Sequence, residues 1–316
     1  MTAQAPVVNL PRPGRLAGFR RSETLWALVF LSPWIAGFVI FTAGPMVASF
    51  LLSFTDYSAL RPGGPNVVGL DNYIRMAQDP KVVRSLGNTV YYTLLHVPLS
   101  MAVALALALI LNRVGRSSGF FRTVFYLPAV TPAVAIGILW LWLLNPQVGL
   151  VNRGLAVIGI DGPAWTTDTD WIKPGIVLMS LWSLGTTVVI YFAALRNVPQ
   201  DLYEAARIDG ANRAQQFRNV TLPMISGALF FTLVVNTISS LQIFSEVYTM
   251  YFGNQEGGAS ASAALFYVIY LFQQAFKFFH LGYASAMAWL LFIVILAITL
   301  FQLRLSKRWV YYEGES

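Results

Sequence analysis

The sequence predicts an all-α polytopic membrane protein with six transmembrane helices. The 316-residue chain is 56% hydrophobic and only 11% charged, and its mean hydropathy is +0.60, whereas soluble domains carry about 25% charged residues. Its few charges separate uncharged stretches that reach the roughly 20 residues a helix needs to cross a bilayer. The chain has no cysteine, which excludes disulfides and thiolate metal sites.

Six uncharged runs are long enough to be spanning helices, and a seventh is not. The first run exceeds the apolar core of about 7 to 15 residues of a signal peptide and lacks an evident cleavage site, so we expect an uncleaved helix. In the seventh run, 257–276, the apolar part Ala261–Phe272 has 12 residues, a length typical of interfacial or re-entrant segments. We interpret it as an external helix leading into the last span. The six spanning runs are 24–55, 85–112, 123–152, 174–195, 219–245 and 278–303.

The distribution of Lys and Arg predicts that both termini are cytoplasmic. With six spans, 14 of the 21 basic residues fall on one side, and basic residues are enriched in cytoplasmic loops. A seventh span would put the basic C-terminal cluster outside, so parity supports six. The net charge of +7 is thereby explained by topology and not by a nucleic-acid-binding face. The 14 residues are Arg12, Arg15, Arg20, Arg21, Arg113, Arg116, Arg122, Arg196, Arg207, Arg213, Arg218, Arg304, Lys307 and Arg308.

These spans divide the chain into one membrane domain and two tails. We expect a cytoplasmic N-terminal tail at 1–23, a six-helix transmembrane domain at 24–303 and a cytoplasmic C-terminal tail at 304–316. A cytoplasmic loop at 196–221 carries several charges. The outer loops, rich in Pro, Gly, Asp and Trp, are 56–84, 145–173 and 246–280.

The segment YEAARIDGANRAQQFRNVTLP, Tyr203 to Pro223, predicts a helix, a turn and a second helix. Pro199 can begin a helix, and Gln200 to Ile208 contains good helix formers. Asp209-Gly210 supplies the turn, since glycine tolerates a left-handed backbone, and a second helical piece follows over Ala211 to Arg218. From the residues alone, a knob for a partner's groove and a solvated connector between two spans are equally good interpretations.

This segment resembles the signature loop of inner-membrane subunits of binding-protein-dependent ABC importers. The similarity consists of E-A-A, then Gly210, then V-T-L-P, with Val220 where Ile is commoner and Ser226 where a second Pro often occurs. In that family the loop forms coupling helices that sit in a cleft of the ATPase subunit. The resemblance therefore implies an ATPase-coupling role for Tyr203, Glu204, Ala205, Ala206, Asp209, Gly210, Leu222 and Pro223.

Other stretches resemble the carbohydrate-uptake branch of this family, in particular the maltose and glycerol-phosphate type of first permease. They are VGLDNY at 68–73, NTVYYT at 88–93, the run 120–152 and LGYASAMAWLLF at 281–292. The usual T-G-G-P of the last outer loop is reduced to Gly253-Asn254 and Gly257-Gly258. The resemblance implies the type I importer architecture in the bacterial or archaeal inner membrane. It also implies a heterodimer with a second permease subunit, two copies of an ATP-binding subunit, an extracytoplasmic solute-binding protein and a small-molecule carbohydrate substrate.

A polar stripe in the fifth run marks a candidate substrate pathway. Asn236, Ser239, Ser240 and Ile243 recur at i, i+3, i+4 and i+7, on one face of a helix, and Gln242 lies beside them. Such residues also glue membrane helices together, but the resemblance aligns them with the sugar-contacting helix of maltose-type permeases. In the fourth run, Trp182, Ser183, Thr186 and Thr187 form a similar but weaker group.

The sequence points away from catalysis by this chain. None of the four lysines follows a G-x-x-x-x-G-K-[ST] phosphate loop, so ATP hydrolysis is expected on a separate subunit. With two histidines and no cysteine, we expect no catalytic residue, cofactor or metal site. The acids Asp161, Asp168 and Asp170 are interpreted as a surface loop that touches a binding protein.

Two alternatives for transport stay open. Import of glycerol phosphate or a polyol fits the same resemblance. An ion-coupled secondary transporter is the other, although such proteins usually carry Asp, Glu or His in their spans. Here the six runs contain no acid and have only His96 well inside one.

Overall fold

The computed structural model describes residues 13–114, 118–253 and 259–311, and the regular elements in these ranges are all helical. A single antiparallel bridge, between Thr55 and Val67, closes the first outer loop. The α-helices are α1 (Pro13–Phe38), α2 (Gly44–Leu52), α3 (Asp71–Gln78), α4 (Pro80–Arg113), α5 (Ser118–Tyr126), α6 (Ala133–Leu143), α7 (Leu150–Val157), α8 (Ile172–Ser180), α9 (Gly185–Arg196), α10 (Gln200–Ile208), α11 (Arg213–Gln216), α12 (Leu222–Met224), α13 (Ser226–Leu241), α14 (Ser245–Tyr251), α15 (Ala259–Ala263), α16 (Tyr267–Phe272) and α17 (Leu281–Ser306).

The described residues include four helical stretches that are long and apolar enough to cross a membrane, or up to six if each of two bent pairs is one span. Each coincides with one predicted run, so the all-α membrane architecture is confirmed. The single stretches are Leu25–Leu52, Pro80–Arg113, Ser226–Tyr251 and Leu281–Ser306, and the bent pairs are Gly119–Val130 with Ala133–Leu143 and Ile172–Ser183 with Gly185–Arg196.

The two bent pairs have local causes in the sequence. Between α5 and α6 the axis turns by 98°, where a 3-10 turn, Leu127–Val130, is followed by extended backbone at Thr131 and Pro132. Proline lacks an amide proton and disfavours helical backbone in the residue before it, so the helix cannot continue through this site. Between α8 and α9 a 3-10 turn precedes Gly185 and the bend is 51°. A Cβ on Gly185 would collide with the backbone at Phe125, so glycine permits α9 to pass α5.

The seventh run is not among the candidate spans of the described residues, and it is more deeply buried than expected of an external helix. It forms the short helices α15 and α16, and α16 packs against α4 and α17. Tyr267, Ile269 and Tyr270 are each at most 4% exposed, because this aromatic and branched segment fills the space beside α4. Residues 254–258, which include Asn254, Gly257 and Gly258 of the reduced outer-loop motif, lie outside the described ranges.

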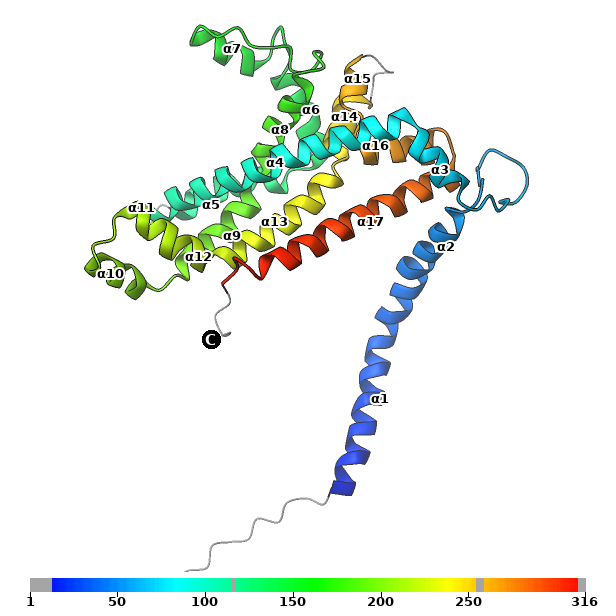
Figure 1. Ribbon diagram of the computed structural model, residues 1–316, viewed down its shortest axis with the longest axis horizontal. Coiled ribbons are helices and arrows are strands. Elements are labelled where there is room, and N and C mark those ends of the chain that lie inside the picture. The colour runs from blue at the N-terminus through cyan, green and yellow to red at the C-terminus, as the bar shows by residue number, and fades with distance from the viewer. Residues whose placement is uncertain (1–12, 115–117, 254–258, 312–316) are drawn as a thin grey trace, which may run out of the picture.

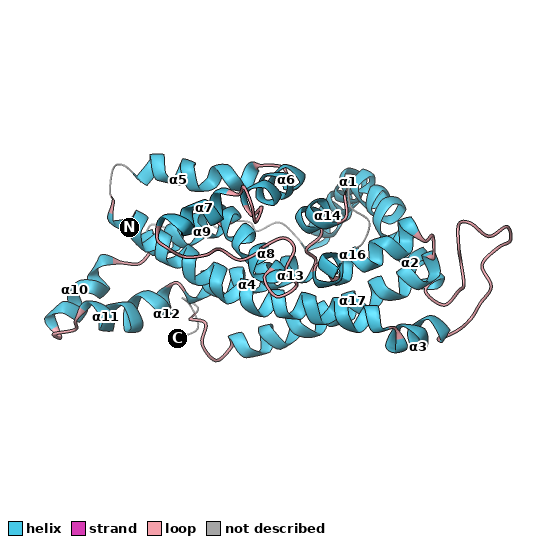
Figure 2. Ribbon diagram, turned by 90° about the horizontal axis from the view of Figure 1, so that it is seen from above, coloured by secondary structure: helices cyan, strands magenta, loops and turns pink. Residues whose placement is uncertain are grey.

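Helix α4 is the centre of the packed body. It packs against α9 and α13 and, further along, α8 and α16, and Figures 1 and 2 show it running lengthwise beside α13, with α17 on the far side of α13. Ala104 and Ala108 are fully buried on α4. Small side chains at such contacts let membrane helices approach closely, which increases the packing energy between them.

Helix α1 stands apart from this body. Figure 1 shows it extending away from the other helices after α2 turns from α17, and none of its most apolar window is buried, against 22–28% for the other three single stretches. Phe30, Trp34 and Phe41 are 78%, 69% and 80% exposed. Among the described residues, therefore, none covers the apolar surface of α1 from Leu25 onward, which suits a helix surrounded by lipid or another subunit.

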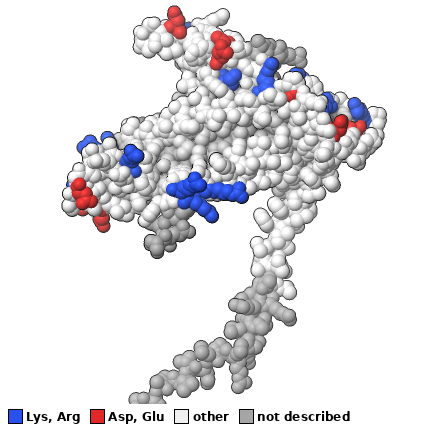
Figure 3. Space-filling model, in the orientation of Figure 1, with Lys and Arg blue, Asp and Glu red and all other residues white. Residues whose placement is uncertain are grey.

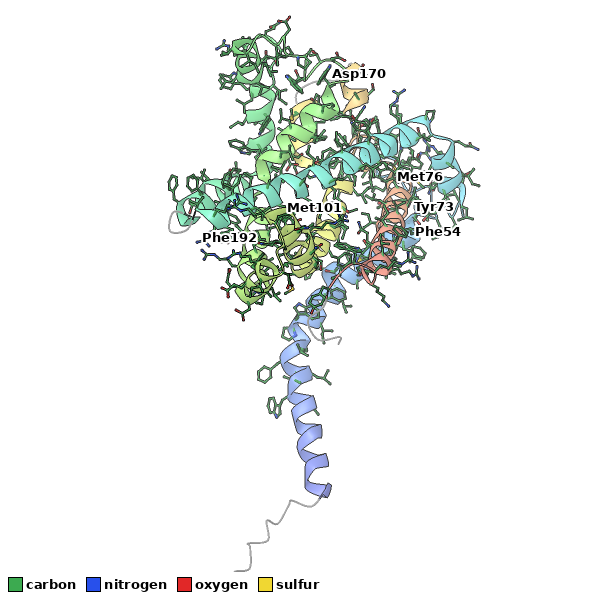
Figure 4. The ribbon with its side chains drawn as sticks, turned by 60° about the vertical axis from the view of Figure 1, so that its left-hand side comes forward. Phe54, Tyr73, Met76, Met101, Asp170 and Phe192 are labelled. Atoms are coloured by element: carbon green, nitrogen blue, oxygen red, sulfur yellow. The ribbon has the colours of Figure 1, made fainter. Side chains whose placement is uncertain are left out.

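Charges gather at the ends of the helical body. On the face in Figure 3 the middle is almost free of Lys, Arg, Asp and Glu, which appear over α10 to α12, near the end of α17 and along the opposite side. At the α10 end, the guanidinium groups of Arg122 and Arg196 lie 5.1 Å and 4.8 Å from the centre of the Phe192 ring, which is labelled in Figure 4. Such cation–π contacts anchor helix ends where the apolar layer stops.

At the opposite end, one carboxylate joins three helices. Asp79 accepts hydrogen bonds from the Tyr270 hydroxyl at 2.6 Å, the Tyr283 hydroxyl at 3.0 Å and the Lys81 amide at 2.9 Å, so it caps α4 and holds α16 and α17 to it. Figure 4 shows Phe54, Tyr73 and Met76 beside this junction. Burial raises the pKa of the Asp79 carboxyl, but these hydrogen bonds to the charged form outweigh it and leave the pKa below 3.8.

Replacement of Asp79 with Ala is expected to destabilise the folded protein by about 2–3 kcal/mol near pH 7, because two phenol hydroxyls lose a charged acceptor. Because the pKa of Asp79 is depressed in the folded protein, its carboxylate contributes this stability in full above about pH 4. The contribution is lost as the pH falls through the folded-state pKa of Asp79. Thermal unfolding in detergent of the wild type and Asp79→Ala should therefore differ at pH 7, and the difference should shrink as the pH falls below about 4. A gap that stays constant over this range would contradict the assignment. Asp71→Asn, an exposed acid in α3, is the control.

Candidate functional site

A polar cavity of about 340 Å³ lies between the helices in the middle of the packed body. It is bounded by α4, α6, the α8–α9 bend and the α13–α14 junction. Polar side chains dominate its lining although apolar helices surround it, which is the arrangement expected of a water-accessible path through a membrane protein. The lining residues are Tyr92, His96, Ser100, Ile136, Met179, Ser180, Ser183, Leu184, Thr187, Asn236, Ser239, Ser240, Gln242, Ile243, Phe244, Ser245 and Glu246.

Most of the predicted pathway residues line this cavity. All five from the fifth run do so, and Ser183 and Thr187 join them from the fourth. Trp182 and Thr186 do not: both are exposed on the outside of the bend, where Trp182 packs edge-on against Trp140 with ring centres 6.1 Å apart. Thr186 and Thr187 are adjacent in α9 and point to different sides of the helix, so only Thr187 faces the cavity. The five from the fifth run are Asn236, Ser239, Ser240, Gln242 and Ile243.

Helix α4 contributes a polar face that the sequence analysis missed. Tyr92, His96 and Ser100 follow one another at intervals of four residues on α4 and all line the cavity. The Tyr92 and His96 rings stack with centres 5.0 Å apart, Tyr92 shares a 2.7 Å hydrogen bond with Ser180, and His96 Nδ1 lies 2.9 Å from Ser240 Oγ. The i, i+4, i+8 spacing inside an otherwise apolar run was the signal that could have identified them.

The α13–α14 junction brings an acid into the cavity. Helix α13 ends at Leu241, the backbone turns at Phe244, and α14 begins at Ser245. Glu246 therefore lines the cavity and belongs to the candidate membrane span Ser226–Tyr251. Helix α14 continues through Glu246, the charge that ended the fifth uncharged run and at which we expected the outer loop to begin.

Asn236 faces the same cavity with an unused donor. Its Nδ2 atom is buried and, within the described residues, donates no hydrogen bond to the protein. A buried amide that makes no hydrogen bond costs free energy comparable to a lost hydrogen bond. At a cavity wall, this group is available to a polar solute.

Helices α6 and α14 approach closely beside the cavity. A Cβ on Gly137 would lie 2.8 Å from the Glu246 carbonyl oxygen and 3.1 Å from the Thr249 Cβ atom. The absence of a side chain at Gly137 therefore fixes the distance between the two helices. It also positions the backbone that carries Glu246.

The predicted helix, turn and helix at the other end of the body are confirmed. Helix α10 ends at Ile208 with Asp209 as its C-cap, and Gly210 has a φ of +77°, the left-handed conformation that glycine adopts without strain. The second helix, α11, begins at Arg213, later than the predicted Ala211, because Asn212 and Gln215 form a reciprocal capping box. A π-helical turn, Phe217–Thr221, then leads to α12, which contains Leu222 and Pro223.

Helix α10 has one attached face and one free face. The Tyr203 hydroxyl shares a 3.0 Å hydrogen bond with Thr221 Oγ1, and Ala206 is half-buried. On the other face Glu204, Ala205 and Asp209 are exposed, and Ile208 is 87% exposed. This face therefore combines two exposed acids with one exposed apolar group.

A second cavity, of about 480 Å³, lies between α10–α11 and the ends of α4 and α9. Arg113, Arg207 and Arg213 line it without any Asp or Glu among the lining residues, and no ion pair involves them in the described part of the chain. The arrangement concentrates positive charge on the attached side of α10, beside Tyr203.

The sequence matches the profile of a family described as "Binding-protein-dependent transport system inner membrane component" over residues 97–311. The probable ABC transporter permease protein YesP of Bacillus subtilis is 40% identical over 298 residues, covering 93% of this chain and 94% of YesP. The lactose transport system permease protein LacF of Rhizobium radiobacter is 33% identical, covering 87% and 91%. The arabinooligosaccharides transport system permease protein AraP of Bacillus subtilis is 30% identical, covering 94% of each chain.

Solved structures show the same architecture. A chain of a bacterial alginate ABC transporter, in complex with an alginate pentasaccharide-bound periplasmic protein, superposes with a TM-score of 0.78 at 26% identity, covering 92% of this chain and 96% of that one. A second structure, of a bacterial ABC transporter involved in the import of the acidic polysaccharide alginate, gives 0.77 at 26% identity, covering 93% and 98%.

Replacement of Gly137 with Ala is expected to destabilise the packed body by about 1–3 kcal/mol, because the added methyl group overpacks the α6–α14 contact. The matched control is Gly87→Ala in α4, where a Cβ would meet no atom within 4 Å; it should be neutral or stabilising. Thermal unfolding of both variants in the same detergent measures the difference. Equal stability of the two variants would contradict this packing role.

Proposed function

Since the chain belongs to the family of binding-protein-dependent transport system inner membrane components, we propose that it forms half of the translocation pathway of an ATP-driven importer for a sugar or oligosaccharide. It is a multi-pass protein of the plasma membrane. Relatives named for lactose and arabinooligosaccharide transport support the substrate class. The observation that carries the proposal is the central cavity, lined by hydroxyl, amide and imidazole groups of the kind that bind sugar hydroxyls.

The chain is proposed to transmit force rather than to generate it. It carries no phosphate-binding loop, so an ATPase subunit, in two copies, supplies the energy. A second permease subunit completes the pathway, and both termini lie in the cytoplasm. A soluble binding protein delivers the sugar to the outer loops, where Asp161, Asp168 and Asp170 are among the exposed acids. The binding-protein complex of the alginate transporter chain supports this assembly.

Helix α10 is the proposed contact with the ATPase. Its free face offers an acid, Glu204, a flat surface at Ala205 and a fully exposed apolar group, Ile208, a combination that suits a helix held in a groove. Tyr203, Ala206, Leu222 and Pro223 lie on the attached side and carry the motion into the membrane domain. The arginines of the neighbouring cavity would receive acidic side chains of the same partner.

The connections to the cavity make this coupling mechanical. Three residues link α9 to α10, and α11 continues through the π-helical turn and α12 into α13. Helices α9 and α13 both line the cavity, through Thr187 and through Asn236, Ser239 and Ser240. A shift of α10 when the ATPase dimer closes would therefore move two walls of the sugar site, as expected for switching between inward-open and outward-open states.

One structural feature favours an ion-coupled mechanism, and the family comparison argues against it. Glu246 puts an ionisable group inside a candidate span, which is common in ion-driven pumps. The family of this chain, however, is defined by its dependence on a binding protein. Uptake that persists after the ATPase is inactivated and stops when ion gradients collapse would favour the ion-coupled mechanism.

Glu204→Ala should lower sugar-stimulated ATPase activity of the complete transporter at least about fivefold, the lower bound for a typical coupling free energy. The reason is that Glu204 is proposed to contact the ATPase. Asp201→Ala removes an equally exposed acid from the first turn of the same helix and is the matched control. Stimulation is measured in proteoliposomes that contain the binding protein. Retention of full stimulation in Glu204→Ala would count against α10 as the coupling element.

Asn236→Ala and Ser240→Ala should each reduce sugar uptake roughly fivefold, the effect of losing a hydrogen bond worth about 1 kcal/mol. Initial uptake rates of radiolabelled sugar, normalised to the amount of transporter in the membrane, measure the loss. Thr186→Ala, which lies outside the cavity lining, is the control and should transport normally. If both variants take up sugar as fast as Thr186→Ala, the polar stripe on α13 serves helix packing and not sugar binding.

A further inference from the structure

The charge in the central cavity is unbalanced. Glu246 is the one Asp or Glu in the described lining, and neither Lys nor Arg is present there. The remaining ionisable side chains that line it are His96, which is engaged with Ser240, and Tyr92, which is engaged with Ser180. This chain's half of the pathway therefore presents a negative charge with no counter-ion of its own.

The position of Glu246 is set by the fold and does not result from a mobile surface chain. The residue is half-buried in the first turn of α14, and its backbone is held against Gly137 on α6. It lines the same cavity as Tyr92 on α4 and Asn236 on α13. A solute in the cavity therefore passes within reach of the carboxylate.

A carboxylate in this setting distinguishes solutes by charge. Away from bulk water, the repulsion between two like charges a few ångströms apart is much stronger than in solvent, and it selects against the wrong ligand without improving contacts to the right one. Toward an uncharged sugar the same group is an acceptor for hydroxyl protons. The Asn236 amide provides the complementary donor, so the pair matches the alternating groups of a polyol.

The comparisons with known proteins do not determine whether this chain's substrate is neutral or acidic. Relatives at similar distances are named for a neutral disaccharide, lactose, and solved homologues for an acidic polysaccharide, alginate. The family therefore includes carriers of both kinds. Only the side chains of the cavity can assign this chain to one of them.

We propose that Glu246 is a charge filter that restricts the transported solute to carbohydrates without acidic groups, and so excludes uronates, sugar phosphates and sulfonated sugars. The proposal rests on the proposed function, because it assumes that the central cavity is the sugar path. It deepens that function by naming the substrate class and the residue that determines it.

The test uses cells that express the complete transporter and a panel of uncharged and acidic sugars of similar size. Lactose, arabinotriose and maltotriose are compared with trigalacturonate and an alginate trisaccharide as radiolabelled substrates. The expected result is uptake of one or more uncharged sugars and none of the acidic ones. Efficient uptake of an acidic trisaccharide by the wild type would overturn the charge filter while leaving sugar import intact. Failure to take up any carbohydrate would overturn the proposed function and the filter with it.

The second arm tests the residue directly. Purified complete transporter, without binding protein, is titrated with the transported sugar and with its singly carboxylated derivative, and ligand-induced thermal stabilisation is measured. In Glu246→Gln, the affinity for the acidic derivative relative to the neutral sugar should rise at least about tenfold, the change that removal of a modest repulsion gives. An unchanged ratio would overturn the proposal.

Two further variants serve as controls for this affinity ratio. Asp71→Asn removes a negative charge from an exposed position in α3 and should leave the affinity ratio at the wild-type value. Glu246→Asp keeps the charge and should keep the discrimination, even where Glu246→Gln assembles poorly. Loss of discrimination in Glu246→Asp would show that side-chain length rather than charge determines it, and would also overturn the filter.

Discussion

A polar group inside a bilayer has to find a partner within the protein or in water, and this constraint organises the membrane domain. Several of the polar side chains within the candidate spans make hydrogen bonds that join one helix to another: Tyr191 to Thr232 across α9 and α13, and Gln302 to Thr237 across α17 and α13. The His96–Ser240 contact at 2.9 Å does the same for α4 and α13 at the wall of the cavity. The side chains left over from this pairing, such as Asn236 and Glu246, face the cavity, where a solute or water can meet them.

The bends in the helices follow from the same constraint. A break in a membrane helix frees backbone groups, which are tolerated where protein or a water-filled cavity surrounds them. The α8–α9 bend and the α13–α14 junction both occur at the cavity. The helices are therefore irregular where the site needs irregular walls, and α4, which is continuous despite Pro98, provides the straight support between them.

The sequence was sufficient for the features that depend on one segment at a time. Uncharged runs located the spans, Asp209-Gly210 located the turn after α10, and a period of 3.6 residues located the polar face of α13. It was insufficient where a side chain's place depends on another helix. Of the two adjacent threonines in α9, only Thr187 lines the cavity, and contacts with α4 and α17 bury α16. Helix α14 continues past Glu246, a charge that marked the end of the uncharged run in the sequence.

Helices α1 and α4 should differ strongly in the substitutions that they tolerate. The most apolar window of α1 is not buried within this chain. Its side chains are therefore constrained by contact with lipid or another subunit and not by packing within this chain, and many different apolar sequences of sufficient length fit a lipid environment. The interior of α4, by contrast, admits only alanine-sized groups at positions such as Ala104 and Ala108. Substitutions should therefore accumulate freely along α1 during divergence, while the α4 positions tolerate almost none.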